Sequence, residues 1–190
     1  MQIARKLVEK QRTSQKVFDG ELLQVYKDEV ILPDGNTSYR EWIDHPGACA
    51  ILPVLQNGQV VLISQFRYPV GQIFFEVPAG KIDPGEDPFD TIERELKEEA
   101  GVTARNIAYT GLFYPAIGYA NEVIHLYVAW DCDQQENNVD PDEFVEPWKI
   151  SFSESLSMVA NGEITDGKTM ACLWKAKIWW EKNGPFKINL

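Results

Sequence analysis

Residues 79–101, AGKIDPGEDPFDTIERELKEEAG, constrain the fold of this chain more than any other stretch. Apolar residues recur there at intervals of three and four, at Phe89, Ile92, Leu96 and Ala100. This spacing is typical of a helix with one apolar face, because successive residues of a helix turn by about 100°. We therefore predict a helix over residues 88–100 that packs this face against a core.

Three glutamates, Glu95, Glu98 and Glu99, lie within this predicted helix. Residues at i, i+3 and i+4 share one side of a helix, where like charges destabilise it by about 0.2–0.5 kcal/mol per pair. One interpretation is an acidic face in contact with water. The other is a metal site, because carboxylates and a backbone carbonyl from the end of the preceding strand at Ala79 are the hard-oxygen ligands that Mg²⁺ and Mn²⁺ prefer. A bound cation would remove the repulsion.

Residues 1–45 alternate apolar and polar side chains around the turn sequence PDGN, which predicts an antiparallel β-meander that forms a layer of its own. Residues 46–190 form the second predicted domain. Within it, residues 47–69 contain two strand-like runs separated by Asn57 and Gly58, a pair typical of a hairpin turn. Residues 73–80 predict a short strand that Pro78 and Gly80 end.

The C-terminal part predicts a strand at residues 123–130, an acidic loop at 131–143, a strand at 143–151 and two helices, for which Ser153 and Asp166 are the expected N-caps. This order favours an α/β fold with a mixed sheet between helices. Residues 162–169, GEITDGKT, match the P-loop pattern. A P-loop follows a buried strand, whereas the preceding SESLSMVAN predicts a helix, so we interpret the match as accidental.

Charge and composition exclude several classes of protein. The formal net charge of −11 over 190 residues argues against non-specific binding to nucleic acid or to anionic membranes. No apolar stretch approaches the roughly 20 residues needed to span a bilayer, and the first residues lack the apolar core of a signal peptide. Three cysteines without metal-ligand spacing, Cys49, Cys132 and Cys172, favour reduced thiols and a cytoplasmic location.

The region around the glutamates resembles the Nudix box, which reads glycine, five residues, glutamate, seven residues and then Arg-Glu-aliphatic-x-Glu-Glu-x-Gly-aliphatic. All nine defined positions are present without a gap: Gly80, Glu86, Arg94, Glu95, Leu96, Glu98, Glu99, Gly101 and Val102. If each position matched by chance about one time in ten, the coincidence would be on the order of one in a billion. The resemblance implies the Nudix α/β/α sandwich, preceded here by a small N-terminal antiparallel β layer.

The resemblance also implies roles for matched residues. In Nudix hydrolases the glutamates of the box bind divalent metals, with help from the carbonyl before the first glycine. The implied ligands of Mg²⁺ or Mn²⁺ are Ala79, Glu95, Glu98 and Glu99. Arg94 would orient a ligand glutamate and, with Glu98, serve catalysis, while Glu86 would be a structural partner of Arg94. Gly80 and Gly101 are expected to allow tight turns at the helix ends.

Most of the chain resembles the ADP-ribose pyrophosphatase branch of this family, in REWIDHPGACAILPV, ISQFRYPVGQIFFEVPAGKID, YANEVIHLYVA, DEFVE and GEITDGKT. The resemblance implies that Arg67 contacts a substrate phosphate, with a surface salt bridge as the alternative, and Arg40 is a second candidate. Glu143 matches a loop glutamate that acts as catalytic base or extra metal ligand, with Asp142 as the fallback and a solvated carboxylate as the alternative. Glu122 would touch the terminal sugar or the metals, or be structural.

The chain departs from this branch after the box. Many of its enzymes have a Ser-Pro-Gly-like turn where this chain has Ala116, Ile117 and Gly118. Gly118 is expected in the loop that faces the distal sugar, and loss of the proline removes a restriction on φ. We therefore predict tolerance of several sugar nucleotides. His45 and His125 are expected to be structural.

The implied function is Mg²⁺-dependent hydrolysis of ADP-ribose and related nucleoside diphosphate sugars to a nucleoside monophosphate and a sugar phosphate. The alternatives are a broader sugar-nucleotide hydrolase that prefers another substrate, such as GDP-mannose, and a non-catalytic Nudix module that senses a nucleotide. A homodimer is expected, because this branch commonly uses the N-terminal segment, here residues 1–45, to complete the partner's site. Nucleic acid and membrane are not expected partners.

Overall fold

The computed structural model describes residues 6–134 and 144–189. The chain divides into two compact units. Unit 1 comprises Met1–Pro46 and Ala116–Glu122, and unit 2 comprises Gly47–Pro115 and Val123–Leu190. Among the helices of the described ranges, none is long and apolar enough to cross a membrane.

Unit 1 contains a three-stranded antiparallel meander of β1 (Lys10–Asp19), β2 (Gln24–Ile31) and β3 (Thr37–Asp44). The PDGN turn joins β2 to β3. Gly35 adopts a φ of 91° there and donates a hydrogen bond to the carbonyl of Leu32 at 2.9 Å, a conformation that glycine reaches without steric cost. Residues 116–122 join this unit because the Ile43 N–H donates to the carbonyl of Tyr119 at 2.8 Å. The predicted N-terminal β layer is confirmed.

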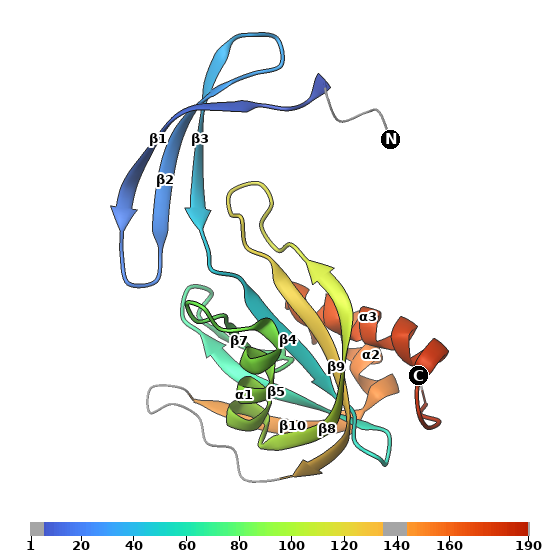
Figure 1. Cartoon of the computed structure of the whole chain (residues 1–190). Helices are drawn as coiled ribbons and strands as arrows, with labels where there is room; N and C mark the ends of the chain where they lie inside the picture. Colours follow the sequence, from blue (N-terminus) through green and yellow to red (C-terminus); the bar gives the residue numbers. More distant parts are fainter. Residues whose placement is uncertain (1–5, 135–143, 190) are drawn as a thin grey trace. The chain divides into compact units, whose positions relative to one another are not determined.

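Unit 2 is an α/β/α sandwich (Figure 1). One sheet has the strand order β7-β4-β9-β8 and the other β10-β5-β6. The strands are β4 (Ala48–Pro53), β5 (Gln59–Arg67), β6 (Gln72–Glu76), β7 (Ala79–Lys81), β8 (Val102–Phe113), β9 (Ile124–Gln134) and β10 (Val145–Ser151). The helices are α1 (Pro88–Ala100), α2 (Phe152–Asn161) and α3 (Gly167–Asn183). β4 pairs in parallel with β9 and antiparallel with β7, so the predicted mixed sheet is confirmed.

The strand β4 explains why helices cover both faces. All six of its residues are buried, and successive side chains of a strand point to opposite faces. Leu52 packs into the core beneath α2 and α3, whereas Ile51 packs into the core beneath α1. Figure 1 shows α1 on one side of the strands and α2 with α3 on the other. A strand that is apolar at every position needs such cover on both sides.

At Asn57 and Gly58 the predicted turn forms, but the prediction that the two flanking strands pair as a hairpin is wrong. The turn itself forms, with Gly58 at a φ of 81° and the Leu55 N–H donating to the carbonyl of Gln59 at 2.8 Å. However, β4 and β5 lie in different sheets, and a single bridge at Val54 connects their ends. The reason is that β7 and β9 already occupy both edges of β4, so no edge remains for β5.

Other boundaries also differ from the predictions. The helix at residues 88–100 is confirmed, but Phe89 is 42% exposed and does not join the buried face. Ala79 and Gly80 lie in β7, which Pro78 separates from β6, so they do not end the preceding strand. The side chain of Ser151, not of Ser153, caps α2. The strand predicted at 123–130 extends to residue 134, and its partner β8 was not predicted.

Candidate active site

α1 is held at both ends, which gives its acidic turn a defined place. Asp87 is the N-cap and accepts a hydrogen bond from the backbone of the first turn at 2.8 Å. Gly101 ends the helix with a φ of 61° and donates to the carbonyls of the last turn. Between the caps, Ile92 and Leu96 are buried in the core of unit 2. Rotation of the helix about its axis would expose them, so the glutamates keep one orientation.

The three glutamates differ in exposure. Glu95 and Glu99 are only 8% and 3% exposed, whereas the side chain of Glu98 is 31% exposed. Oε2 of Glu99 accepts a hydrogen bond from the backbone N–H of Ala79 at 2.8 Å, which ties the last turn of α1 to β7. This contact uses the N–H of Ala79, whereas the sequence prediction concerned its carbonyl. Carboxylates buried in this way need compensating partners.

β7 passes so close to α1 that glycine is required at position 80. A Cβ on Gly80 would lie 1.8 Å from Oε1 and 2.1 Å from Cδ of Glu95. Only a residue without a Cβ permits this approach of backbone and carboxylate. Gly80 therefore gives room to Glu95, and does not form the tight turn at the helix end that the sequence predicted.

Arg94 links three carboxylates of this region. Its Nη1 donates to Glu95 at 2.7 Å and to Glu98 at 3.1 Å, and its Nε and Nη2 each lie 3.4 Å from oxygens of Glu86. Burial acts against the charge of Arg94, but Glu86, Glu95 and Glu98 raise its pKa above the ordinary value. In return, Arg94 and then Thr91 lower the pKa of Glu86. Arg94 thus offsets part of the repulsion that the sequence pattern implied.

A second charged cluster surrounds Glu76, which sequence reasoning missed. Arg67, at the end of β5, forms a two-point pair with Glu76, with Nε and Nη2 each 2.7 Å from a carboxylate oxygen. Lys168 also donates to Glu76, and to Asp166 at 3.0 Å. The side chain of Glu76 is 2% exposed and that of Arg67 is 41% exposed. A charged residue inside the apolar run IFFEVP was the signal that could have found this cluster.

The two clusters are joined by one short segment of chain. Glu76 ends β6, and Ala79, which contacts Glu99, begins β7 three residues later. The pKa of Arg67 is raised above its ordinary value. The hydrogen bond with Glu76 contributes most, burial acts in the opposite direction, and the charges of Glu99 and Asp166 add to the increase. Arg67 therefore lies within electrostatic reach of the acidic turn of α1.

The P-loop-like residues 162–169 connect two helices. Gly162 ends α2 with a φ of 84°. Asp166 is the N-cap of α3, as predicted, and accepts from the N–H of Thr169 at 3.0 Å. No strand precedes this segment, since α2 lies directly before it. The interpretation of the match as accidental is confirmed.

The remaining predicted substrate-binding residues lie in unit 1. Arg40, on β3, donates through Nε to Glu9 at 2.9 Å and again through Nη2. The carboxylate of Glu122 lies 3.9 Å from Nε2 of His45. Gly118 is exposed, and a Cβ there would meet nothing within 4 Å. The clustering of predicted residues is therefore a property of unit 2, formed by Ala79, Arg67, Arg94 and the three glutamates.

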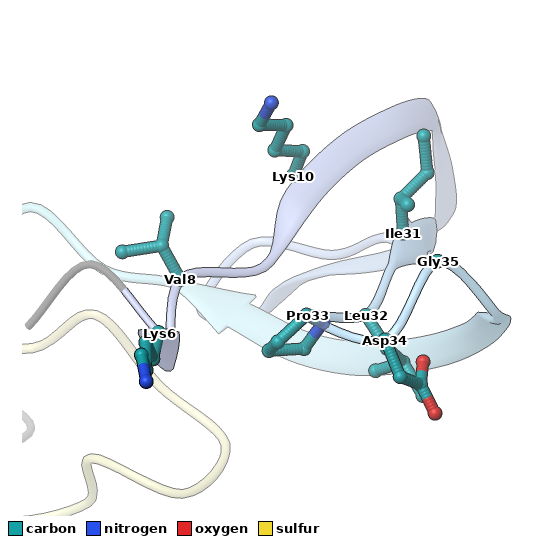
Figure 2. Close-up of a pocket in the computed structure, with 8 residues that line it drawn as sticks. All are labelled: Lys6, Val8, Lys10, Ile31, Leu32, Pro33, Asp34 and Gly35. Atoms are coloured by element: carbon teal, nitrogen blue, oxygen red, sulfur yellow. The ribbon is translucent and has the colours of Figure 1, made fainter.

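The predicted catalytic base Glu143 and its fallback Asp142 lie outside the described residues. His125 is on β9, where its ring centroid lies 6.0 Å from that of Tyr109. Unit 1 contains a cavity of about 620 Å³, formed by residues before and at the start of β1, by the end of β2 and by the β2–β3 turn; Figure 2 shows the residues that line it. Its lining, Lys6, Val8, Lys10, Ile31, Leu32, Pro33, Asp34 and Gly35, includes no predicted site residue.

Comparison with known proteins decides the family. Residues 44–170, about two thirds of the chain, match the family model described as the NUDIX domain. This chain belongs to the NUDIX family. The Nudix chain is 36% identical over 167 residues to the ADP-ribose pyrophosphatase of Bacillus subtilis (strain 168), covering 87% of this chain and 90% of that one. Its acidic turn is therefore part of a Nudix diphosphatase that is similar to ADP-ribose pyrophosphatases.

Two further relatives and one solved structure extend the comparison. The chain is 37% identical over 164 residues to the methanol dehydrogenase activator of Bacillus methanolicus, covering 85% and 89% of the two chains. It is 33% identical over 161 residues to the GDP-mannose pyrophosphatase of Yersinia enterocolitica, covering 78% and 84%. The crystal structure of an ADP compounds hydrolase matches with a TM-score of 0.81 at 18% identity, covering 94% and 97%. The last match shows that the fold is shared.

Nudix proteins typically depend on a divalent metal, for which the carboxylates of α1 are the candidate ligands. Within residues 6–134 and 144–189, no three His, Cys, Asp or Glu side chains converge closely enough to hold an ion. The donor types nevertheless fit Mg²⁺, because Glu95, Glu98 and Glu99 offer carboxylate oxygens on one helix turn beside backbone atoms of β7. The three glutamates therefore fit a divalent metal by the chemistry of their oxygen atoms.

Proposed function

We propose that this Nudix chain hydrolyses the diphosphate bond of ADP-ribose and related nucleoside diphosphate sugars, to give a nucleoside monophosphate and a sugar phosphate. The observation that carries the proposal is the position of Arg67 and the acidic turn of α1 at the two ends of one short segment, residues 76–79. A diphosphate needs both a cationic contact and a site for divalent metal. The similarity to an ADP-ribose pyrophosphatase over most of both chains supports the choice of substrate.

Each residue of the site has a task in this proposal. Glu95, Glu98 and Glu99, with the carbonyl of Ala79, would hold Mg²⁺ or Mn²⁺, which when bound would neutralise phosphate charge and make water a better nucleophile. Arg94 holds Glu95 and Glu98 in position through its Nη1. Arg67 binds a substrate phosphate, which a guanidinium recognises through paired N–H groups.

The proposal assigns proton transfer and sugar recognition to residues elsewhere. Glu143 accepts the proton of the attacking water, with Asp142 as the fallback. Arg40 and Glu122 bind the substrate in this proposal, and Gly118 lies in the loop that faces the distal sugar. The test of Glu143 is kinetic: Glu143→Gln should reduce kcat more than it raises KM, as a transition-state role requires. Unchanged kcat in both Glu143→Gln and Asp142→Asn would remove this segment from the mechanism.

We further propose that residues 1–45 form a homodimer interface in the cytoplasm. Every residue of β1 is exposed in the single chain, and large apolar side chains on this unit are exposed as well, among them Val17, Phe18 and Leu22. Exposed apolar side chains of this kind are available to contact a second copy of the chain, which supports the proposal. Sedimentation that shows a fully active monomer at assay concentrations would rule the dimer out.

One substrate panel tests the function. It compares kcat/KM for ADP-ribose, GDP-mannose, UDP-glucose, diadenosine polyphosphates and nucleoside triphosphates with Mg²⁺, by phosphate release through a coupled phosphatase. ADP-ribose should rank at or near the top and yield AMP and ribose 5-phosphate. Preference for GDP-mannose would favour the related activity named for the Yersinia relative. A tenfold preference for triphosphates or dinucleoside polyphosphates, about 1.4 kcal/mol in transition-state binding, would refute the sugar-nucleotide assignment.

The panel also separates enzyme from sensor. A Glu95→Gln variant purified in the same way is the control for contaminating phosphatases, because it alters a proposed metal ligand and leaves the purification unchanged. Turnover by the wild-type protein with none in the control supports an enzyme. Nucleotide binding without turnover of any substrate would instead identify a non-catalytic Nudix module.

A further inference from the structure

We infer that Glu76 and Lys168 are positioning residues for Arg67. Glu76 orients the guanidinium group, and Lys168 keeps its positive charge available for a substrate phosphate. This inference rests on the proposed function, in which Arg67 contacts the diphosphate. It gives a task to the lysine of the accidental P-loop match, and to a buried glutamate that the sequence patterns did not single out.

Glu76 determines which edge of the Arg67 guanidinium is presented. Both oxygens of Glu76 are engaged, one with Nε and one with Nη2 of Arg67, at 2.7 Å each. Two parallel hydrogen bonds of this kind hold the planar guanidinium in one orientation. In the part of the chain that the structure describes, no protein acceptor contacts Nη1 of Arg67. Because the side chain is 41% exposed, this edge is open to an anion.

Lys168 changes the charge balance of the pair. Arg67 and Glu76 alone would form a neutral pair with little remaining attraction for a phosphate. Lys168 donates to the same Oε2 of Glu76 that Arg67 uses, so two cations share one carboxylate. Asp166 supplies a second negative charge, and its Oδ2 also accepts from the N–H and Oγ1 of Thr169 at 3.0 and 2.6 Å. Without Lys168, the charges of Arg67, Glu76 and Asp166 would therefore sum to a net negative charge.

The first turn of α3 holds Lys168 in this place. Asp166 caps the helix, and Lys168 is its second residue. Oγ1 of Thr169 accepts a hydrogen bond from the N–H of Val77 at 2.9 Å. This bond ties the start of α3 to the residue that follows Glu76, so the lysine and the glutamate cannot drift apart. The side chain of Lys168 is only 15% exposed, which limits its screening by water and salt.

The test measures ADP-ribose affinity by calorimetry in EDTA, where no turnover occurs, and steady-state kinetics with Mg²⁺. Lys168→Met should weaken binding about tenfold, a factor that corresponds to about 1.4 kcal/mol, and should raise KM by a similar factor with kcat changed much less. Lys168→Arg keeps the charge and should bind within about twofold of the wild type. Lys177→Met removes a more exposed lysine–glutamate pair from the same helix and should bind like the wild type.

A double-mutant cycle isolates the coupling between the two residues. In the background of Glu76→Gln the carboxylate that Lys168 shares with Arg67 is gone and Lys168 keeps only its pair with Asp166, so adding Lys168→Met should change the affinity less than about twofold. A tenfold loss in that background would overturn the inference, because Lys168 would then act on the substrate directly. Wild-type affinity in Lys168→Met would overturn it as well.

Further measurements cover a variant that does not fold and separate a failure of this inference from a failure of the proposed function. If Lys168→Met does not fold, Lys168→Gln retains a hydrogen-bond donor without the charge, and the same weakening is expected; unchanged affinity would overturn the inference. If the wild-type protein binds and hydrolyses ADP-ribose while Lys168 variants behave normally, only this inference fails. If the wild-type protein neither binds nor hydrolyses ADP-ribose, the proposed function fails together with it.

Discussion

Gly80→Ala should inactivate the protein while leaving it folded. The new Cβ would lie 1.8 Å from Oε1 of Glu95, whereas ordinary contact begins at 3.4 Å. The carboxylate must therefore retreat by roughly 1.6 Å, while the backbone of β7 stays paired with β4. Because the clashing atoms belong to the end of a long side chain, Glu95 moves and the sheet does not. The hydrogen bond from Arg94 to Glu95, now 2.7 Å, would be lost.

The cost in stability follows from these contacts. An off-rotamer side chain costs about 0.5–1.5 kcal/mol, and the lost charge-assisted bond costs about 1.5 kcal/mol at the low end, since Arg94 keeps Glu86 and Glu98. Replacing glycine by alanine stabilises the protein by about 0.4–1 kcal/mol, because it reduces the conformational entropy of the unfolded chain. The net loss of about 1–2.6 kcal/mol should lower Tm by about 2–10 °C. Displacing a proposed metal ligand by more than about 1 Å should reduce kcat/KM about 100-fold.

The assay combines thermal unfolding with kcat/KM for ADP-ribose over a Mg²⁺ titration. Gly167→Ala is the matched control, because its Cβ would meet Phe113 at an ordinary 3.5 Å. It should keep wild-type activity and stability. Wild-type kcat/KM in Gly80→Ala at limiting Mg²⁺ would refute the reasoning. A fall in Tm far above about 10 °C would show instead that the glycine serves the fold.

Three further predictions concern charge and burial. Glu99→Gln should lose most of its kcat at limiting Mg²⁺, about 100-fold, and a near wild-type rate would contradict its assignment as a ligand. Burial raises the pKa of three thiols to about 12, so native protein at pH 8 should react slowly with a thiol reagent, in contrast to protein in urea; fast native labelling would refute this for Cys49, Cys132 and Cys172. Burial acts to raise the pKa of Asp166, but Lys168 and the hydrogen bonds from Thr169 together outweigh burial, so the folded pKa is lowered. Asp166 therefore stabilises the fold above the unfolded value of about 3.9 and less as pH falls through the folded pKa. Asp166→Asn should be less stable than wild type to urea at pH 7, and the difference should shrink at pH 3; a constant difference would contradict this.

The sequence alone was sufficient where structure depends on neighbours within one or two turns. The spacing of Ile92, Leu96 and Ala100 predicted α1 with the bounds that it has, because a helix brings together residues three and four apart. The same spacing predicted that Glu95, Glu98 and Glu99 share a side. Capping by Asp166 was predicted for the same local reason, and so was the meander around PDGN.

The sequence did not reveal pairings between distant segments. Asn57 and Gly58 form the turn that they predicted, yet β4 pairs with β9, more than 70 residues away, and not with β5. The partner of a strand depends on which sheet edges the whole chain leaves free, and two residues of turn carry no information about that. The substrate-binding role of Arg40, Glu122 and Gly118 stays a prediction.

Tertiary structure alone decided how the charges are compensated. Glu76 and Lys168 lie 92 residues apart in the chain, and neither has a local pattern that points to the other. Their pairing arises because a Thr169 hydroxyl joins the start of α3 to the end of β6. Likewise, residue 80 must be a glycine because a strand and a helix that are separate in sequence approach within contact of Glu95. Sequence periodicity indicates which side of a helix or strand a residue occupies. The partner of a buried charge depends instead on how the elements pack. A buried charge is costly unless another element places a counter-charge beside it.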